Sequence, residues 1–84
     1  MDMDNDNKVN VKEALFETIQ SQIENRSPKE TKEAYDRLVL KGCSHADSMR
    51  MIALALVREM NDALKSGRPF KEERYIKALK DLPR

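Results

Sequence analysis

Residues 45–66 constrain the fold more than any other part of the chain. Apolar side chains recur through this segment at helical spacing, and within residues 49–57 (MRMIALALV) only Arg50 is polar. A helix on the surface of a small protein normally has one apolar stripe, and this stripe is wider. The segment therefore predicts a long helix contacted from several sides. It is central to a bundle, it meets another subunit, or both.

The ends of this helix are marked by residues with defined local preferences. In residues 41–47 (KGCSHAD), Gly42 ends the preceding helix, and Ser44 begins the next one with Asp47 in the position of a capping-box acid. Gly67, followed by Pro69, ends the long helix. The boundaries 45–66 follow from these signals.

Three further helices are predicted, over about residues 10–25, 28–41 and 71–82. Asn10 caps the first helix in a capping box with Glu13, and Ser27 caps the second, with Pro28 as its first residue. The side chains expected to point inward are Val11, Leu15, Phe16, Ile19 and Ile23, then Ala34, Tyr35, Leu38 and Val39, then Ala46, Met49, Ile52, Ala53, Leu56, Val57, Met60, Ala63 and Leu64, and finally Phe70, Tyr75, Ile76, Leu79 and Leu82.

The sequence predicts an all-α fold, a small four-helix bundle with a long, largely buried third helix. The 84 residues allow one domain at most. Residues 1–8 alternate Asp and Asn and are expected to be a disordered acidic tail, and residues 9–84 form a single helical domain. A single cysteine, no signal-peptide pattern and no apolar run near the roughly 18 residues of a membrane span favour a cytoplasmic protein with no membrane contact.

Cys43 and His45 are the candidates for chemistry that stand out first. The chain has no other Cys or His to complete a zinc site, and a Cys-His pair needs a third group to orient it. No phosphate loop or other enzyme motif occurs. We therefore expect a protein that is not an enzyme, with no catalytic residues, metal, cofactor or small-molecule substrate. Cys43 and His45 then belong to the corner between two helices.

Charge is distributed unevenly along the chain, although its net value is only +1. Residues 1–26 contain six acids and three bases, whereas residues 67–84 contain six bases and three acids. Arg74, Lys77 and Lys80 repeat at helical spacing and are a possible nucleic-acid patch. Arg74 has a second interpretation, in which it pairs with Glu59 or Asp62 of the long helix.

Residues 37–83 resemble a family of small helical bacterial proteins of unknown function. The pattern ends in G-x-P-F-x-x-x-R-Y-x-x-x-L-x-x-L-P. Within residues 37–83, Ser48 and Lys71 are less typical of the family. Its positions here are Arg37, Leu38, Gly42, Ser44, Ile52, Glu59, Leu64, Gly67, Pro69, Phe70, Arg74, Tyr75, Leu79, Leu82 and Pro83. The resemblance implies a small helical bacterial protein and no particular activity.

The breadth of the apolar helix favours protein association over the other functions. Met51, Leu54 and Ala55 are apolar outside the main stripe, and an 84-residue chain has few elements with which to cover a whole helix. We therefore expect these three residues to form an interface, with a second copy of the chain as the partner. The expected function is a non-catalytic, homodimeric or accessory module; nucleic-acid binding is the alternative.

Overall fold

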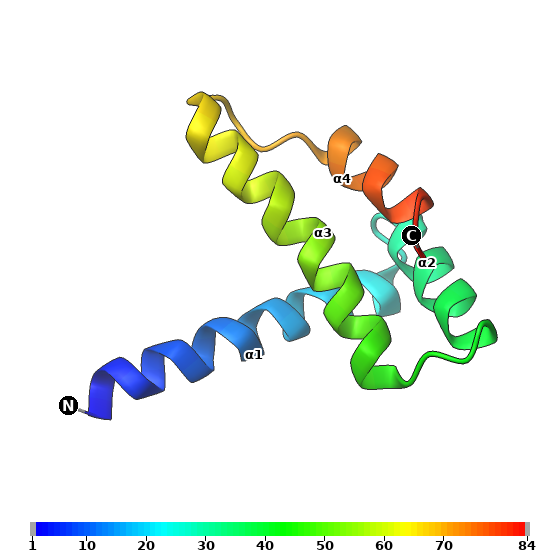
Figure 1. The fold of residues 1–84 in the computed structure, drawn as a ribbon, viewed down its shortest axis with the longest axis horizontal. Helices are drawn as coiled ribbons and strands as arrows, with labels where there is room; N and C mark the ends of the chain where they lie inside the picture. The colour runs from blue at the N-terminus through cyan, green and yellow to red at the C-terminus, as the bar shows by residue number, and fades with distance from the viewer. Residues whose placement is uncertain (1, 84) are drawn as a thin grey trace.

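The computed structural model describes the backbone of residues 2–83 and the side chains of residues 12–83. Four helices follow one another along the chain, and no strand occurs in residues 2–83 (Figure 1). They are α1 (Asp2–Asn25), α2 (Lys29–Leu40), α3 (His45–Ser66) and α4 (Glu72–Lys80). The predicted all-α four-helix bundle is confirmed.

Helix α1 begins at Asp2, earlier than the start near residue 10 that the sequence predicted. The disordered tail expected over residues 1–8 and the cap expected at Asn10 both fall on residues whose side chains lie outside the described part of the chain. Both therefore stay predictions. The end of the helix at Asn25 agrees with the sequence.

The predicted boundaries of α3 are confirmed at both ends. The Ser44 hydroxyl accepts a hydrogen bond from the Asp47 backbone N–H at 3.1 Å. At the other end, Gly67 adopts a left-handed conformation with φ 67°, and the Arg68 N–H donates to the Ala63 carbonyl at 3.1 Å. These local contacts satisfy one free N–H in the first turn of the helix and one free carbonyl in its last turn.

The predicted end of α2 is confirmed, but the cap predicted at its start is wrong. Gly42 follows the helix with φ 100°, in the left-handed region that the sequence indicated. At the start, Pro28 occupies the capping position in an extended conformation, and α2 begins one residue later, at Lys29. Ser27 consequently lies one position too early, and its backbone N–H bonds to the Gln22 carbonyl of α1 instead.

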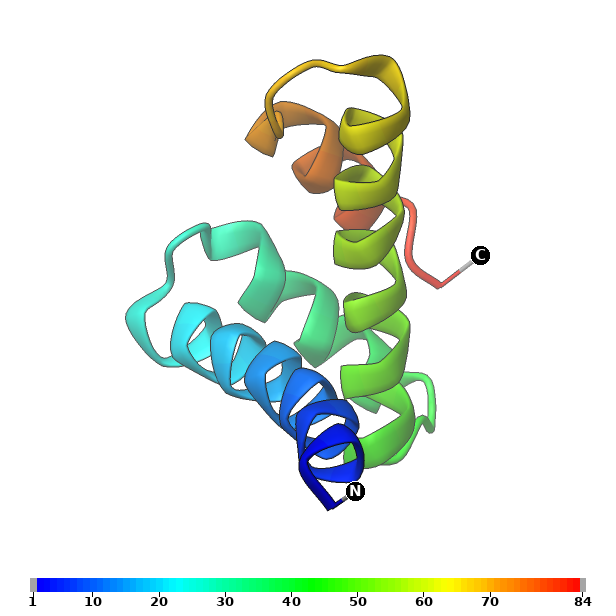
Figure 2. The same cartoon turned by 90° about the vertical axis from the view of Figure 1, so that its left-hand side faces the viewer.

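Helices α2 and α3 each contact the other three helices, and the core lies between them. Figure 2 shows α1 and α2 side by side, with α3 running past both of them and α4 returning along its second half. Most of the buried residues belong to α3. The apolar core consists of Ile19, Ala34, Leu38, Met49, Ile52, Ala53, Ala55, Leu56, Tyr75, Leu79 and Leu82.

Several side chains predicted to be inward are exposed. Leu64 and Met60 on α3 are 80% and 44% exposed, Ala46 is exposed as well, Val39 on α2 is 44% exposed, and Phe70 is 42% exposed. Figure 1 shows why Leu64 and Met60 of α3 are not covered by α1. Helix α1 crosses the first half of α3, and the second half extends past α1. The apolar stripe continues beyond the helix that covers it.

Replacing a core leucine tests this arrangement against a matched surface leucine. Leu38 is fully buried, and Leu38→Ala is expected to lower the free energy of unfolding by about 2–5 kcal/mol. Leu40, two residues further along the same helix, is 86% exposed, and Leu40→Ala is expected to change it by less than about 0.5 kcal/mol. Urea denaturation measures both values, and equal losses would contradict the orientation of α2.

Ser48 offers a second test, since its hydroxyl is buried without a hydrogen-bond partner in the described part of the chain. Ser48→Ala removes a desolvated polar group and is expected to raise the free energy of unfolding by about 1 kcal/mol. Ser44→Ala, four residues earlier, removes the cap of α3 and is expected to lower it by a similar amount, about 1 kcal/mol. A loss of stability in Ser48→Ala would show that this hydroxyl is paired.

Candidate association surface

The buried carboxylate of Glu59 on α3 holds the α3–α4 loop and the first turn of α4. It accepts hydrogen bonds from Arg68 Nη1 at 2.8 Å, Arg74 Nε at 3.0 Å and the Lys71 backbone N–H at 3.3 Å. A second nitrogen of Arg74, Nη2, lies 3.9 Å from Asp62 Oδ2. The interpretation that Arg74 pairs with an acid of the long helix is therefore confirmed.

These contacts keep Glu59 ionised. The hydrogen bond from Arg68 is the largest cause, and the pKa of Glu59 falls to about 2 from an ordinary value of 4.5. Burial opposes this shift, while the bonds from Arg74 and the Lys71 backbone add to it. A carboxylate with this pKa holds no proton at neutral pH, so Glu59 is not suited to act as a general acid.

Arg37 on α2 binds the opposite end of α4. Its Nη2 donates to the Leu79 carbonyl at 2.7 Å and its Nε donates to the Leu82 carbonyl at 3.1 Å. A cation at a helix C-terminus interacts favourably with the free carbonyls and with the helix dipole. Only the position of Arg37 in the family-like pattern pointed to this residue, since its contacts join segments far apart in the sequence.

Tyr75 ties the middle of α4 to the other two helices. Its hydroxyl donates to Gln22 Oε1 at 2.8 Å, and the Thr31 hydroxyl donates to the same oxygen at 2.8 Å. Tyr75 is 1% exposed, and burial raises its pKa above 10.0, with the contact to Thr31 opposing the shift. Helix α4 is thus held to α1 and α2 at its middle and to α3 at its start.

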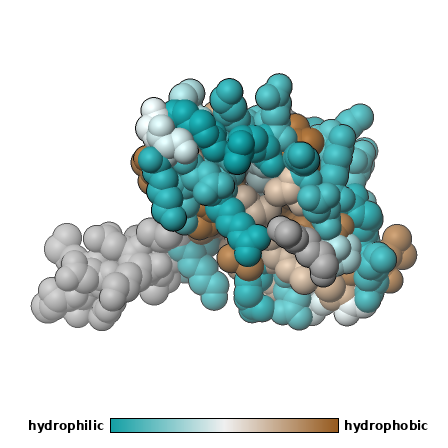
Figure 3. All heavy atoms as spheres, turned by 45° about the horizontal axis from the view of Figure 1, so that its top comes forward, coloured by the Kyte–Doolittle hydropathy of each residue, from teal (hydrophilic) through white to brown (hydrophobic). Residues whose placement is uncertain are grey.

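That surface contains an apolar groove of about 170 Å³. Its lining residues are Met51, Leu54, Ala55, Arg58, Ala78 and Leu82. For comparison, a cavity of about 150 Å³ is enough to hold benzene, so the groove has room for one apolar side chain. Figure 3 shows apolar atoms exposed between hydrophilic side chains on this side of the molecule.

The structure brings the three predicted interface residues together, but they differ in exposure. Leu54 is 54% exposed at the rim of the groove, and Met51 is half-buried. Ala55 is only 7% exposed because α4 packs over it, with Ala78 on the opposite wall. Ala55 therefore forms the floor of the groove, whereas Leu54 is the side chain that a partner would contact most fully.

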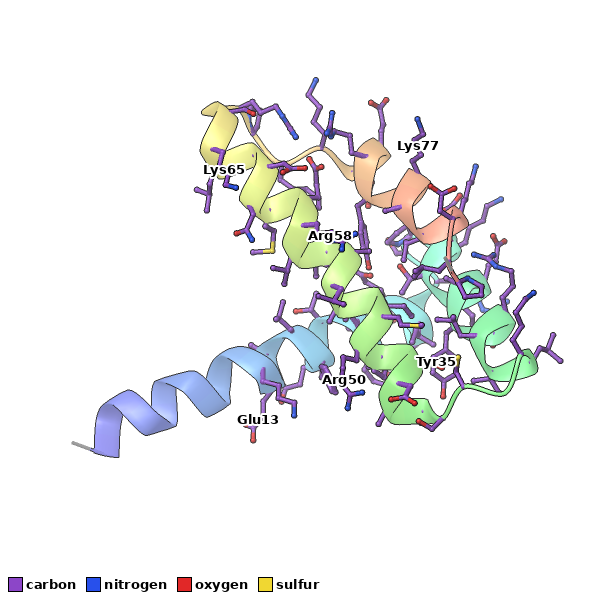
Figure 4. The ribbon with its side chains drawn as sticks, in the orientation of Figure 1. Glu13, Tyr35, Arg50, Arg58, Lys65 and Lys77 are labelled. Carbon is purple, nitrogen blue, oxygen red and sulfur yellow. The ribbon has the colours of Figure 1, made fainter. Side chains whose placement is uncertain are left out.

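The outward face of α3 combines leucine with positive charge. Its exposed residues, at intervals of three or four along the helix, are Arg50, Leu54, Arg58, Asn61 and Lys65. Figure 4 shows Arg50, Arg58 and Lys65 following one another along α3. Arg50 donates to Asp47 at 2.7 Å, while Arg58 and Lys65 form no ion pair within residues 12–83.

The possible nucleic-acid patch on α4 is reduced by the contacts of Arg74. Because Arg74 is held by Glu59 and Asp62, it is not free to track a phosphate backbone. Lys77 and Lys80 are exposed and form no ion pair in the described residues. Tyr75 on the same helix is buried and presents no face on which a base could stack, while the neighbouring ring of Phe70, 6.3 Å away, is 42% exposed.

The corner at residues 41–47 contains one contact that the sequence did not indicate. Tyr35 Oη and His45 Nδ1 lie 2.8 Å apart, so His45 joins α2 to the start of α3. Cys43, in the same corner, is half-buried and packs against the apolar core. In residues 12–83, no three His, Cys, Asp or Glu side chains lie close enough together to hold a metal ion.

Comparisons with protein-family models, curated proteins and solved structures find no match to this chain. The resemblance of residues 37–83 to small helical bacterial proteins therefore stays a prediction. The helices described over residues 2–83 include none with the length and apolar content needed to cross a membrane.

The depressed pKa of Glu59 predicts a specific pH dependence of stability. The folded-state pKa of about 2 lies below the ordinary value of 4.5, so ionised Glu59 stabilises the fold above about pH 4.5. This contribution is lost as the pH falls toward 2. Glu59→Gln is expected to be less stable than the natural chain at pH 7, and the difference is expected to narrow as the pH falls, as measured by urea denaturation.

A control for this experiment is Glu33→Gln. Glu33 is exposed on α2 and forms no ion pair within the described residues. The free energy of unfolding of Glu33→Gln is expected to match that of the natural chain at every pH. If the difference in the free energy of unfolding between Glu59→Gln and the natural chain stays constant down to pH 2.5, the ion-pair role of Glu59 is contradicted.

Proposed function

We propose that the protein is a non-catalytic protein-association module that forms a homodimer through the α3 face beside the α3–α4 groove. The observation that carries the proposal is an exposed leucine, Leu54, at the rim of an apolar groove. A partner that covers Leu54 and the groove removes apolar surface from water, and each Å² removed stabilises the complex by about 25 cal/mol. The groove also offers a partner side chain a place to insert.

Support for a non-catalytic role comes from Glu59. It is the one buried carboxylate of residues 12–83, and three donors hold it ionised in a structural tie. We also propose that the protein acts in the bacterial cytoplasm as an accessory or regulatory protein. Its single cysteine cannot form an internal disulfide, and the family it resembles is bacterial.

The proposal predicts a dimer in sedimentation equilibrium at high micromolar concentration. Leu54→Lys places a charge against the apolar groove and is expected to leave a folded monomer. Circular dichroism checks that the helices are retained. If the natural chain sediments as a monomer at these concentrations, the proposed homodimer is contradicted.

The matched control is Leu40→Lys. Leu40 is 86% exposed at the end of α2, outside the groove, and is more exposed than Leu54. This variant is expected to remain a dimer. If Leu40→Lys dissociates and Leu54→Lys does not, the interface lies at α2 and the proposed surface is wrong.

A further inference from the structure

The outward face of α3 has opposite charges at its two ends. Asp47 lies in the first turn and Lys65 in the last turn, and both are exposed. The two residues are separated by five whole turns, or about 27 Å, so they lie on one line along the helix. Lys65 forms no ion pair within residues 12–83, and Arg50 binds only one oxygen of Asp47, Oδ1. Each end charge can therefore take a partner of opposite sign.

The positions between these ends have the spacing of a helix-pairing seam. Intervals of four and three residues alternate along the line, as they do at the contact positions of a coiled coil. The seam consists of Asp47, Met51, Leu54, Arg58, Asn61 and Lys65. Met51 is half-buried and the other five are exposed. Figure 2 shows α3 at the edge of the molecule, with α1, α2 and most of α4 on one side of it, so the seam is accessible.

Charge selects the direction in which a second copy fits this seam. The intervals read the same in both directions, so an antiparallel copy matches every position when the two-fold axis passes near residue 56. Asp47 of each copy then lies opposite Lys65 of the other. A parallel copy would instead place Asp47 against Asp47 and Lys65 against Lys65, and like charges across an interface oppose association. The two Arg58 side chains approach each other in both arrangements, so they do not favour the parallel one.

The same register brings the exposed leucine to the groove. Leu54 lies opposite Arg58 of the second copy, and Arg58 lines the apolar groove beside Ala78 and Leu82. The methylene stem of an arginine can cover an apolar side chain while its charged end stays in water. The end charges and the groove thus agree on one arrangement. Nucleic acid, by comparison, offers no cation to Asp47 and no apolar cover for Leu54.

We propose that two copies associate through antiparallel α3 helices, with Asp47 against Lys65 at both ends of the contact and Leu54 of each copy in the groove beside Arg58 of the other. The inference rests on the proposed homodimer, and it identifies the direction and the register in which the two copies meet.

Charge reversal at the two ends tests this register by sedimentation equilibrium at low salt. Asp47→Lys places two lysines together at both ends, and Lys65→Asp places two aspartates together there. Each variant is expected to raise the dissociation constant about ten-fold or more. The chain with both changes, and an equimolar mixture of the two single variants, restore opposite charges at both ends. Both are expected to regain nearly the natural dissociation constant.

The double variant also separates pairing from a role within one helix. Asp47 and Lys65 have the charges that the dipole of their own helix favours at its two ends, and the double variant reverses both. A role limited to the stability of α3 therefore predicts that the double variant associates worse than either single variant. If the double variant associates no better than either one, with its helices retained by circular dichroism, the register is overturned and the homodimer stands. A natural chain that is monomeric throughout would overturn both.

The matched controls are Glu33→Lys and Lys29→Glu on α2. Both positions are exposed, form no ion pair within residues 12–83 and lie outside the seam. Each control is expected to leave the dissociation constant unchanged. A ten-fold loss in either control would show that net charge governs association, and would overturn the register.

Disulfide cross-linking measures the register independently of charge. In a Cys43→Ser chain, Met51→Cys with Asn61→Cys places two cysteines opposite each other across the seam, so a mild oxidant is expected to give a covalent dimer. Asn61→Cys alone is expected to remain uncross-linked, because the two copies of position 61 lie about 15 Å apart along the seam. Equal cross-linking of both chains would overturn the register.

A labelled oligonucleotide tests the other class of partner for this face. No binding, or binding that Lys65→Asp leaves unchanged, agrees with antiparallel pairing. Binding that is lost in Lys65→Asp while its self-association stays natural would overturn the pairing and assign the face to nucleic acid.

Discussion

The arrangement of the second half of the chain depends on the ionised carboxylate of Glu59. A buried charge is costly unless it is paired, and all three donors to Glu59 come from the short segment between Arg68 and Arg74. The cost of burying Glu59 is therefore offset only when this segment lies against α3. Docking of α4 and burial of Glu59 are in effect one event, and the groove wall formed by Ala78 and Leu82 depends on it.

The contacts of α4 also give a structural meaning to the sequence pattern of residues 37–83. Arg37 holds the C-terminal carbonyls of α4, Tyr75 reaches Gln22 of α1, and Glu59 and Arg74 form the ion pair at its start. In this chain, these polar positions of the pattern hold a nine-residue helix that is too short to be stable alone. In the described structure the chemistry of these residues is used to position α4.

The same short α4 explains why apolar surface remains exposed. Helix α3 has 22 residues, and its neighbours cover one side of the first half and another side of the second. Leu54 and Leu64 consequently remain in contact with water, and the exposed cations Arg58 and Lys65 belong to the same helix.

Local chemistry in the sequence was sufficient for the helical class and the bounds of α3, because caps, left-handed glycines and helical spacing act within a few residues or along one face. For Arg74 the sequence left two interpretations open, and the contact with Glu59 on another helix decided between them. It was not sufficient for the cap of α2, where Pro28 took the position assigned to Ser27. Nor did it separate Ala55, which is buried, from Leu54, which is exposed, although the two are adjacent in MRMIALALV. Only the tertiary structure decided that difference, since burial of an apolar residue depends on where another helix crosses, and periodicity within one helix contains no information on that position.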